Sequence, residues 1–472
     1  MKKVIHFFIH KKVNLIGLSL AAALFFMAGC SFNMTSYYEK LNGKLESEDY
    51  QGAADYVAKN QSKYGDRNAL MFSLDAGIVN HYAFIYDVSE NNFEDAKNLF
   101  SDYYTKSVSA AALSMIYNDS SMPYYGEDFE SIHITIFNSL NYILSGQDNE
   151  AVVEARQADY LFKGNYRKFY KDDGFVRYFM GLVYENGGYL NDAYVSYSLA
   201  INAYEKGITG IKPPADLIND AYTSAVQLGI SGYAAQLKSK YPQAQVKNIP
   251  KGYGECIVMD YNGIIPKKVE RVINIAFSRA WAYASADNVD SSDMEDFQTA
   301  QSVALAVLSD DYISVAFPAY QSIPHSIYSF SVRGDSGLLG RSYEAQDLGT
   351  IAEKVLNDRI ALIYAKTIAR AAIKYAAGKA ASNYAKEQHG DGIGLLAELS
   401  TKLYSSLSER ADTRGWHTLP ENILMSRFYL PAGENKITVD LIGSNGTVLR
   451  SREITVNVKE GKKNFIVLSS PK

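Results

Sequence analysis

Seven histidines are the side chains most able to bind a metal ion or to act as a general base near neutral pH. Five of them follow residue 29: His81, His133, His325, His389 and His417. They are far apart in the sequence, and none has the HExxH spacing that places two imidazoles on one helix face. The two cysteines, Cys30 and Cys256, are too few for a cysteine-based metal site. The sequence therefore predicts no metal site.

Gly334-Asp335-Ser336-Gly337 resembles the nucleophile loop of trypsin-like proteases. Such a serine needs a histidine and an aspartate supplied by a β-barrel. The preceding half of this chain reads as helical, so an ordinary turn is the better interpretation. Gly378-Lys379-Ala380 lacks the leading glycine and the following Ser or Thr of a phosphate-binding loop. We predict no cofactor and no enzymatic activity.

Charged and aromatic side chains offer candidate binding residues instead. Glu127 and Glu130 lie at the start of a predicted helix, where acids favour the positive helix end. Alternatively, they face Arg156 and Arg177 across a groove. The candidates for partner binding are Glu127, Glu130, Tyr142, Glu154, Arg156, Arg177, Tyr178, Tyr184, Asp412, Arg414 and Trp416.

The segment Asp412-Thr413-Arg414-Gly415-Trp416 lies where helices give way to strands. We interpret it as an Asp–Arg pair that, with the tryptophan, locks this junction. An exposed Trp and Arg would instead be typical of a protein-binding hot spot.

The N-terminus has the pattern of an export signal. Residues 1–29 hold four lysines, no acid, and an apolar stretch from Val13 to Ala28. The sequence Ala28-Gly29-Cys30 resembles the lipobox of bacterial lipoproteins, although Met27 replaces the commoner small residue. The resemblance implies cleavage before Cys30 and acylation of its thiol, which anchors the protein in a membrane. Ser31 favours the outer membrane, facing the periplasm.

Residues 30–245 are rich in helix formers and repeat one theme, an apolar helix followed by a polar turn and a second helix. Gly181, Tyr184, Ala193, Tyr197 and Ala200 have the spacing of the tetratricopeptide (TPR) repeat. A second copy surrounds the turn at residues 145–148. A third, partial copy follows a predicted turn at residues 89–92. This pattern predicts a TPR-like solenoid whose groove binds a partner, although a plain helical bundle would also explain it.

Residues 250–472 are predicted to contain strands as well as helices. We predict a β-rich segment with an insertion at 250–344, long helices at 345–411, and a small β-sandwich at 412–472. In the first of these, residues 269–275 are the expected partner of a strand at 256–259. The earlier strands could also join the sheet of the tail, with the helices as an insertion. Leu430-Pro431-Ala432-Gly433 resembles PEGA-type surface β domains.

Several phrases together resemble an uncharacterised family of TPR-like bacterial lipoproteins. The phrases include Leu74-Asp75-Ala76-Gly77, Tyr125-Gly126-Glu127-Asp128-Phe129-Glu130, Ala316-Phe317-Pro318-Ala319-Tyr320, Ala369-Arg370-Ala371 and Asp412-Thr413-Arg414-Gly415-Trp416. The resemblance spans residues 70–435. It implies work in the cell envelope and no defined activity.

We therefore expect an α+β protein, with an N-terminal TPR-like α-solenoid and a mixed β-sandwich and helical C-terminal region. We expect a lipid-anchored scaffold that binds another envelope protein in cell-wall or outer-membrane assembly. A hydrolase of wall polymers and a purely structural lipoprotein are the alternatives. The net charge of −5 and the lack of a basic block beyond the N-terminus argue against nucleic acid as a partner.

Overall fold

The computed structural model describes residues 34–110, 122–164, 169–276, 312–389 and 410–472. The expected signal peptide and Cys30 lie outside these residues, as do residues 277–311 of the segment expected to hold an insertion and residues 390–409 of the segment expected to form long helices. Within the described ranges, no helix is both long enough and apolar enough to cross a membrane.

Helices make up most of the described residues between 34 and 240, as the sequence predicts. They are α2 (Met34–Glu46), α3 (Tyr50–Lys59), α4 (Gln61–Tyr64), a 3-10 turn (Asp66–Asn68), α5 (Ala69–Tyr82), α6 (Tyr86–Ala110), α7 (Asp128–Leu144), α8 (Asp148–Lys163), α9 (Gly174–Asn186), α10 (Leu190–Lys206), α11 (Ala215–Gln227) and α12 (Ser231–Lys240). Consecutive helices are joined mostly by short turns and pack as pairs. Helices α5 and α7 are buried on nearly every side, so they form the centre of the helical part.

The pair α9 and α10 shows how the repeat spacing produces close packing. Gly181 faces the ring of Tyr197, and a Cβ at this glycine would lie 2.4 Å from the ring. Tyr197 is fully buried, so the ring occupies the space that the missing side chain leaves. The small residue and the aromatic residue thus fit each other across the helix pair, as the TPR-type spacing predicts.

The partial third repeat is placed wrongly by the sequence. Residues 89–92 lie inside α6, and the turn falls at residues 83–85. Asn91 and Asn92 donate side-chain hydrogen bonds to the carbonyl oxygens of Asp87 and Val88, four residues back along the helix. These bonds, at 2.8 and 2.7 Å, satisfy the amides within the helix, so the two asparagines do not end it.

Strands follow from residue 253, and in the described part of this region one long helix lies between them. They are β1 (Tyr253–Asn262), β2 (Lys267–Ala276), β3 (Tyr312–Gln321), β4 (Ile327–Gly334), β5 (Gly337–Arg341), β6 (Tyr343–Asp347), β7 (Asn422–Pro431), β8 (Gly433–Gly443), β9 (Val448–Val458) and β10 (Lys463–Ser470). The helix between β6 and β7 is α15 (Leu348–His389). Asp335 and Ser336 form the turn between β4 and β5, in line with the interpretation above.

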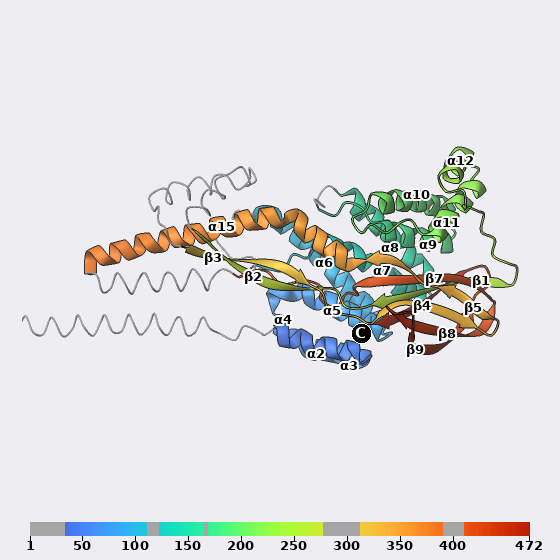
Figure 1. The fold of residues 1–472 in the computed structure, drawn as a ribbon, viewed down its shortest axis with the longest axis horizontal. Coiled ribbons are helices and arrows are strands. Elements are labelled where there is room, and N and C mark those ends of the chain that lie inside the picture. The colour runs from blue at the N-terminus through green and yellow to red at the C-terminus, as the bar shows by residue number, and fades with distance from the viewer. Residues whose placement is uncertain (1–33, 111–121, 165–168, 277–311, 390–409) are drawn as a thin grey trace, which may run out of the picture.

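The strands form two four-stranded sheets and a separate two-stranded ribbon. Sheet A has the order β10-β1-β7-β6, and sheet C has the order β5-β4-β8-β9. The ribbon pairs β2 with β3, and α15 packs along β3. Figure 1 shows α15 and the ribbon extending away from the two sheets.

The expected pairing of residues 269–275 with residues 256–259 is wrong. Strand β1 pairs in parallel with β10 on one side and antiparallel with β7 on the other. Both edges of β1 are thus occupied, and residues 269–275 pair with β3 instead. The four strands of the tail are present, but they are divided between the two sheets and share them with the earlier strands β1, β4, β5 and β6.

Sheet A is buried on both faces. Alternate residues of its strands point to opposite sides. Ile257, Met259 and Tyr261 of β1 join the core of the helical part, whereas Cys256 and Val258 join an apolar layer shared with sheet C. Sheet A therefore lies between the helices and sheet C.

The close fit at Gly181 predicts opposite effects for two glycine substitutions. Gly181→Ala places a methyl group against the buried Tyr197 ring and lowers the free energy of unfolding by about 1–3 kcal/mol. Gly43→Ala, in an exposed part of α2 with no atom near the new Cβ, raises it by up to about 1 kcal/mol. Urea unfolding followed by circular dichroism measures both. A loss of stability at both positions would contradict the packing described here.

Candidate functional site

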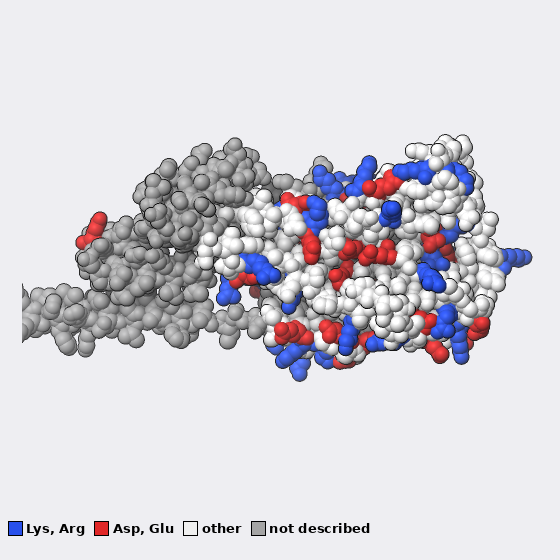
Figure 2. Space-filling model, in the orientation of Figure 1, with Lys and Arg blue, Asp and Glu red and all other residues white. Residues whose placement is uncertain are grey.

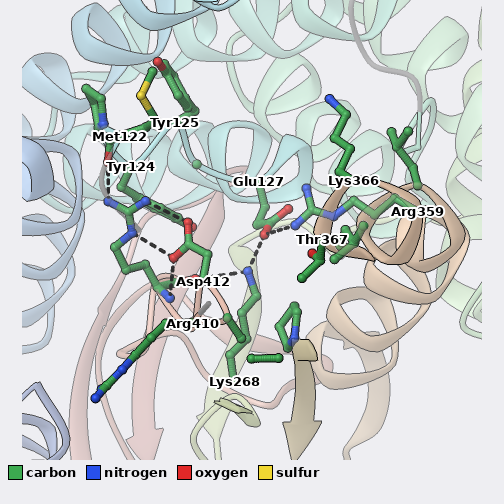
Figure 3. Close-up of a pocket in the computed structure, with 18 of the residues that line it drawn as sticks. Met122, Tyr124, Tyr125, Glu127, Lys268, Arg359, Lys366, Thr367, Arg410 and Asp412 are labelled. Atoms are coloured by element: carbon green, nitrogen blue, oxygen red, sulfur yellow. Dashed lines mark hydrogen bonds and ion pairs between the residues drawn. The ribbon is translucent and has the colours of Figure 1, made fainter. Parts of the chain in front are cut away.

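A half-open pocket of about 390 Å³ lies where several distant parts of the chain meet. Its walls come from the segment before α7 (residues 122–127), from the ribbon β2–β3, from α15, and from residues 410–414. We call it the junction pocket. Figure 3 shows its side chains converging from these separate elements.

Glu127 lies at the floor of the pocket, where the chain turns into α7. Gly126 makes this turn with φ +77°, a conformation that glycine adopts without strain. The backbone N–H of Glu127 donates to the side chain of Glu130 at 2.9 Å. This contact closes the first turn of α7, and Glu127 itself lines the pocket.

Two cations hold the Glu127 carboxylate. Lys268 of β2 forms an ion pair with Glu127 Oε1, and Arg359 Nη2 of α15 reaches the same oxygen at 2.6 Å. Burial alone would raise the pKa of Glu127, but Arg359 and Lys268 outweigh it, and the pKa falls to about 2. Figure 3 shows this bridge joining three elements. The carboxylate is thus ionised and fixed.

Arg414 fixes a second wall. Its guanidinium binds both oxygens of Asp412, at 2.7 and 2.8 Å, and donates to the carbonyl of Met122 at 2.8 Å. It also lies 5.5 Å from the centre of the Tyr124 ring. Burial would raise the pKa of Asp412, but Arg414 lowers it below its usual value. The Asp–Arg pair predicted from the sequence is therefore present, and it ties residues 410–414 to the segment before α7.

Glu130 lies behind the pocket in a fully buried position. Its carboxyl accepts hydrogen bonds from the backbone N–H of Trp416 at 2.7 Å and from the hydroxyl of Tyr124 at 2.7 Å. Burial, followed by the negative charge of Glu127, raises the pKa of Glu130 to about 7. Trp416 is only 2% exposed and packs against the aromatic rings of Phe93 and Phe137. In this structure, Glu130 and Trp416 join the helices to the C-terminal region and do not face solvent.

Arg177 and Tyr184, two other sequence candidates, meet at Asp159. Arg177 binds Asp159 at 3.0 Å and Asp172 at 2.7 Å, and the Tyr184 hydroxyl donates to Asp159 at 2.8 Å. These contacts join α8 and α9. The structure does not bring Arg177 to Glu127. The alternative that Glu127 faces Arg156 and Arg177 across a groove is therefore wrong.

Glu154 and Tyr178 lie in buried networks of their own. Glu154 pairs with Lys97 at 2.7 Å. Tyr178 contacts Asp220 of α11 and Arg427 of β7, which links the helices to sheet A. A buried side chain of this kind supports its neighbours and presents no surface to a partner.

Arg156 and Tyr142 remain at or near the surface of the helical part. The guanidinium of Arg156 lies 5.2 Å from the centre of the Tyr189 ring, and Tyr142 is half-buried at the end of α7. Neither lines the junction pocket. The structure therefore gathers Glu127, Glu130, Asp412, Arg414 and Trp416 at one place and leaves the other six candidates elsewhere.

Sequence reasoning missed five cations that line the pocket: Lys268, Arg359, Lys366, Arg370 and Arg410. Three of them carry a signal that could have been found. Arg359, Lys366 and Arg370 are spaced by seven and four residues, which places them along one side of a helix. Lys268 and Arg410 carry no such signal, because only the tertiary fold brings them to the pocket.

The described residues contain no group of three or more His, Cys, Asp or Glu side chains able to hold a metal ion. No family model and no curated protein matches the sequence. Some solved structures do. One of MamA from AMB-1 is 15% identical over 45% of this chain and 98% of that chain, with a TM-score of 0.27.

A Rap protein in complex with Competence and Sporulation Factor is 12% identical over 43% of this chain and 51% of that chain, with a TM-score of 0.28. The apo form of RapI is 10% identical over 79% of this chain and 76% of that chain, with a TM-score of 0.33. Likenesses this weak carry no argument about fold or function. The fold and site described above stand on the contacts within this chain.

The raised pKa of Glu130 predicts a dependence of stability on pH. A carboxyl whose pKa is higher in the folded protein contributes stability that is complete below its unfolded pKa of 4.5 and is lost as pH rises through about 7. The wild type should lose about 1 kcal/mol more between pH 6 and pH 7 than Glu130→Gln, whose amide mimics the protonated carboxyl, and the difference should level off above pH 7.

Urea unfolding at pH 6, 7 and 8 measures this difference. Glu39→Gln, on the exposed face of α2, is the matched control and should follow the wild type. Parallel curves for the wild type and Glu130→Gln would contradict the environment described for Glu130.

Proposed function

We propose that the protein is a lipid-anchored binding scaffold of the bacterial cell envelope, and that the junction pocket receives its protein partner. The anchor is the acylated Cys30, whose Ala-Gly-Cys context follows a basic and then apolar segment. The location that this pattern favours is the outer membrane, facing the periplasm.

The N-terminal half supports this role as a TPR-like solenoid, whose helix pairs repeat a small-residue and aromatic fit. The inner side of this solenoid is not the binding groove that the sequence suggests. Helices α5, α7 and α9 share a core with sheet A, and Tyr261 of β1 contacts His81 of α5. The chain thus fills its own groove, and a partner needs another place to bind.

The observation that carries the proposal is the preorganisation of the junction pocket. Its floor and one wall are held by ion pairs between distant segments, Glu127 with Lys268 and Arg359, and Asp412 with Arg414. Fixed walls lower the ordering cost of binding. The pocket is also open on one side, so a segment of another chain can enter it.

Anchoring by Cys30 predicts a simple result. After growth with an alkyne analogue of palmitate, the wild type should be labelled and should sediment with membranes. Cys30→Ser should be unlabelled, because the serine hydroxyl is not a substrate for thioether formation. Labelling of the serine variant would place the lipid elsewhere and contradict the proposed anchor.

Binding at the junction pocket predicts site-specific crosslinking in cells. A photoreactive phenylalanine in place of Tyr125, which lines the pocket, should give a discrete crosslinked product with another protein. The same group in place of Tyr160, which is 65% exposed on α8 and outside the pocket, is the control and should give none. Products at Tyr160 alone would move the interface to the helical surface. No product at either position would contradict the scaffold role and favour the wall hydrolase or the structural lipoprotein.

A further inference from the structure

We propose that the junction pocket recognises an acidic segment of the partner, in which carboxylate side chains flank an apolar one. This inference rests on the proposed function, since it names the chemistry of the partner at the same site. It follows from the charge of the lining, from the arrangement of its cations, and from the apolar surface between them.

The residues that line the pocket carry a strong excess of positive charge. Six are basic: Lys268, Arg359, Lys366, Arg370, Arg410 and Arg414. Two are acidic, Glu127 and Asp412. Over the described part of the face drawn in Figure 2, acidic and basic side chains are interspersed. A lining in which basic side chains outnumber acidic ones favours a negatively charged ligand.

The chain's own acids show how a carboxylate fits here. Glu127 is bound by an ammonium and a guanidinium at once, and Asp412 accepts from two nitrogens of the Arg414 guanidinium. Charge-assisted bonds of this kind are stronger than neutral ones. Arg359 uses Nη2 for Glu127, while its buried Nε has no hydrogen-bond partner among the described residues. A further carboxylate bound along the Nε edge, after a small rotation of the guanidinium, would satisfy this donor.

The cations are distributed along the pocket and do not converge on one point. Figure 3 places Arg410 at one end and Lys366 at the other, with Lys268 and Glu127 between them. A single phosphate is best bound by donors that converge on it. A run of carboxylates along a peptide instead matches charges spread over a length of surface, so the arrangement favours an acidic peptide.

Apolar groups separate the cations. Leu362 and Ile363 lie between Arg359 and Lys366 on α15, and Ala316 and Pro318 of β3 add to the same lining. Burial of an apolar side chain against such a surface adds affinity, at roughly 25 cal/mol per Å² of apolar area. The preferred segment therefore alternates acidic and apolar residues and is not a uniformly acidic tract.

A peptide titration tests this inference with the full-length lipidated protein in detergent. The probe is a fluorescein-labelled, glutamate-rich heptapeptide that also contains phenylalanine and leucine, and its anisotropy is measured. We expect saturable binding that weakens as salt rises. The same peptide with glutamine in place of every glutamate should bind at least about tenfold more weakly, because each lost charge-assisted bond is worth about this factor.

Paired substitutions separate the pocket from general electrostatics. Lys366→Glu with Arg410→Glu should weaken binding of the acidic peptide about tenfold or more. Lys59→Glu with Lys206→Glu, at exposed positions on α3 and α10, changes the net charge equally and should leave binding within about twofold. Equal loss in both double variants would overturn the assignment to the pocket. Circular dichroism confirms that each variant remains folded.

Two further outcomes would overturn the inference. One is equal binding of the glutamate and glutamine peptides. The other is binding to phosphatidylglycerol vesicles that Lys366→Glu with Arg410→Glu abolishes, with no binding of the acidic peptide. The second result would identify a phosphate-bearing membrane surface as the ligand. The proposed function fails separately: a crosslinked partner at Tyr125 that the acidic peptide does not displace would preserve the scaffold role and exclude this mode of recognition.

Discussion

The burial of sheet A on both faces is the constraint on which the rest of the structure depends. Strand β1 has the helices on one side and sheet C on the other, and nine of its ten residues are buried. A strand in this position cannot tolerate a shift in register of one residue, because the shift exchanges its two faces. Sheet A therefore contributes to two cores, one with the helices and one with sheet C. The helical part and the β part form one continuous structure.

Buried ion pairs also connect the helices to sheet A. Arg427 of β7 lies on the helical side of the sheet and binds Glu255 of β1 at 2.6 Å as well as Asp220 of α11. Burial opposes ionisation of both acids, but Arg427 and the nearby lysines lower the pKa of each. Loss of one partner in such a group leaves a buried charge uncompensated, which is strongly destabilising. Ion pairs between distant segments also hold the junction pocket, where Arg359 and Asp412 are partly exposed.

The sequence predicts what depends on local spacing and misses what depends on distant partners. The turn at residues 145–148, the fit of Gly181 to Tyr197 and the four strands of the tail all follow from short-range patterns, and the structure contains them. The partner of residues 269–275 does not follow from such a pattern, since strand pairing depends on which strand edges are left unpaired in the folded protein. Lys268 and Arg359 lie 141 and 232 residues from Glu127, and no local pattern connects them. Glu127 was therefore recognisable as a candidate, whereas the cations that define its chemistry were not.

The parallel pairing of β10 with β1 has a consequence for how the chain folds. Glu255 and Lys463, which are paired across these strands, are 208 residues apart. Sheet A is incomplete until β10 has been synthesised, so part of the apolar inner side of the helical part stays uncovered until then. Contacts between such distant residues slow folding and prolong the exposure of apolar surface. The N-terminal helices thus depend in part on β10 for protection from aggregation, and a chain that stops before residue 463 leaves the surface covered by Phe465 exposed.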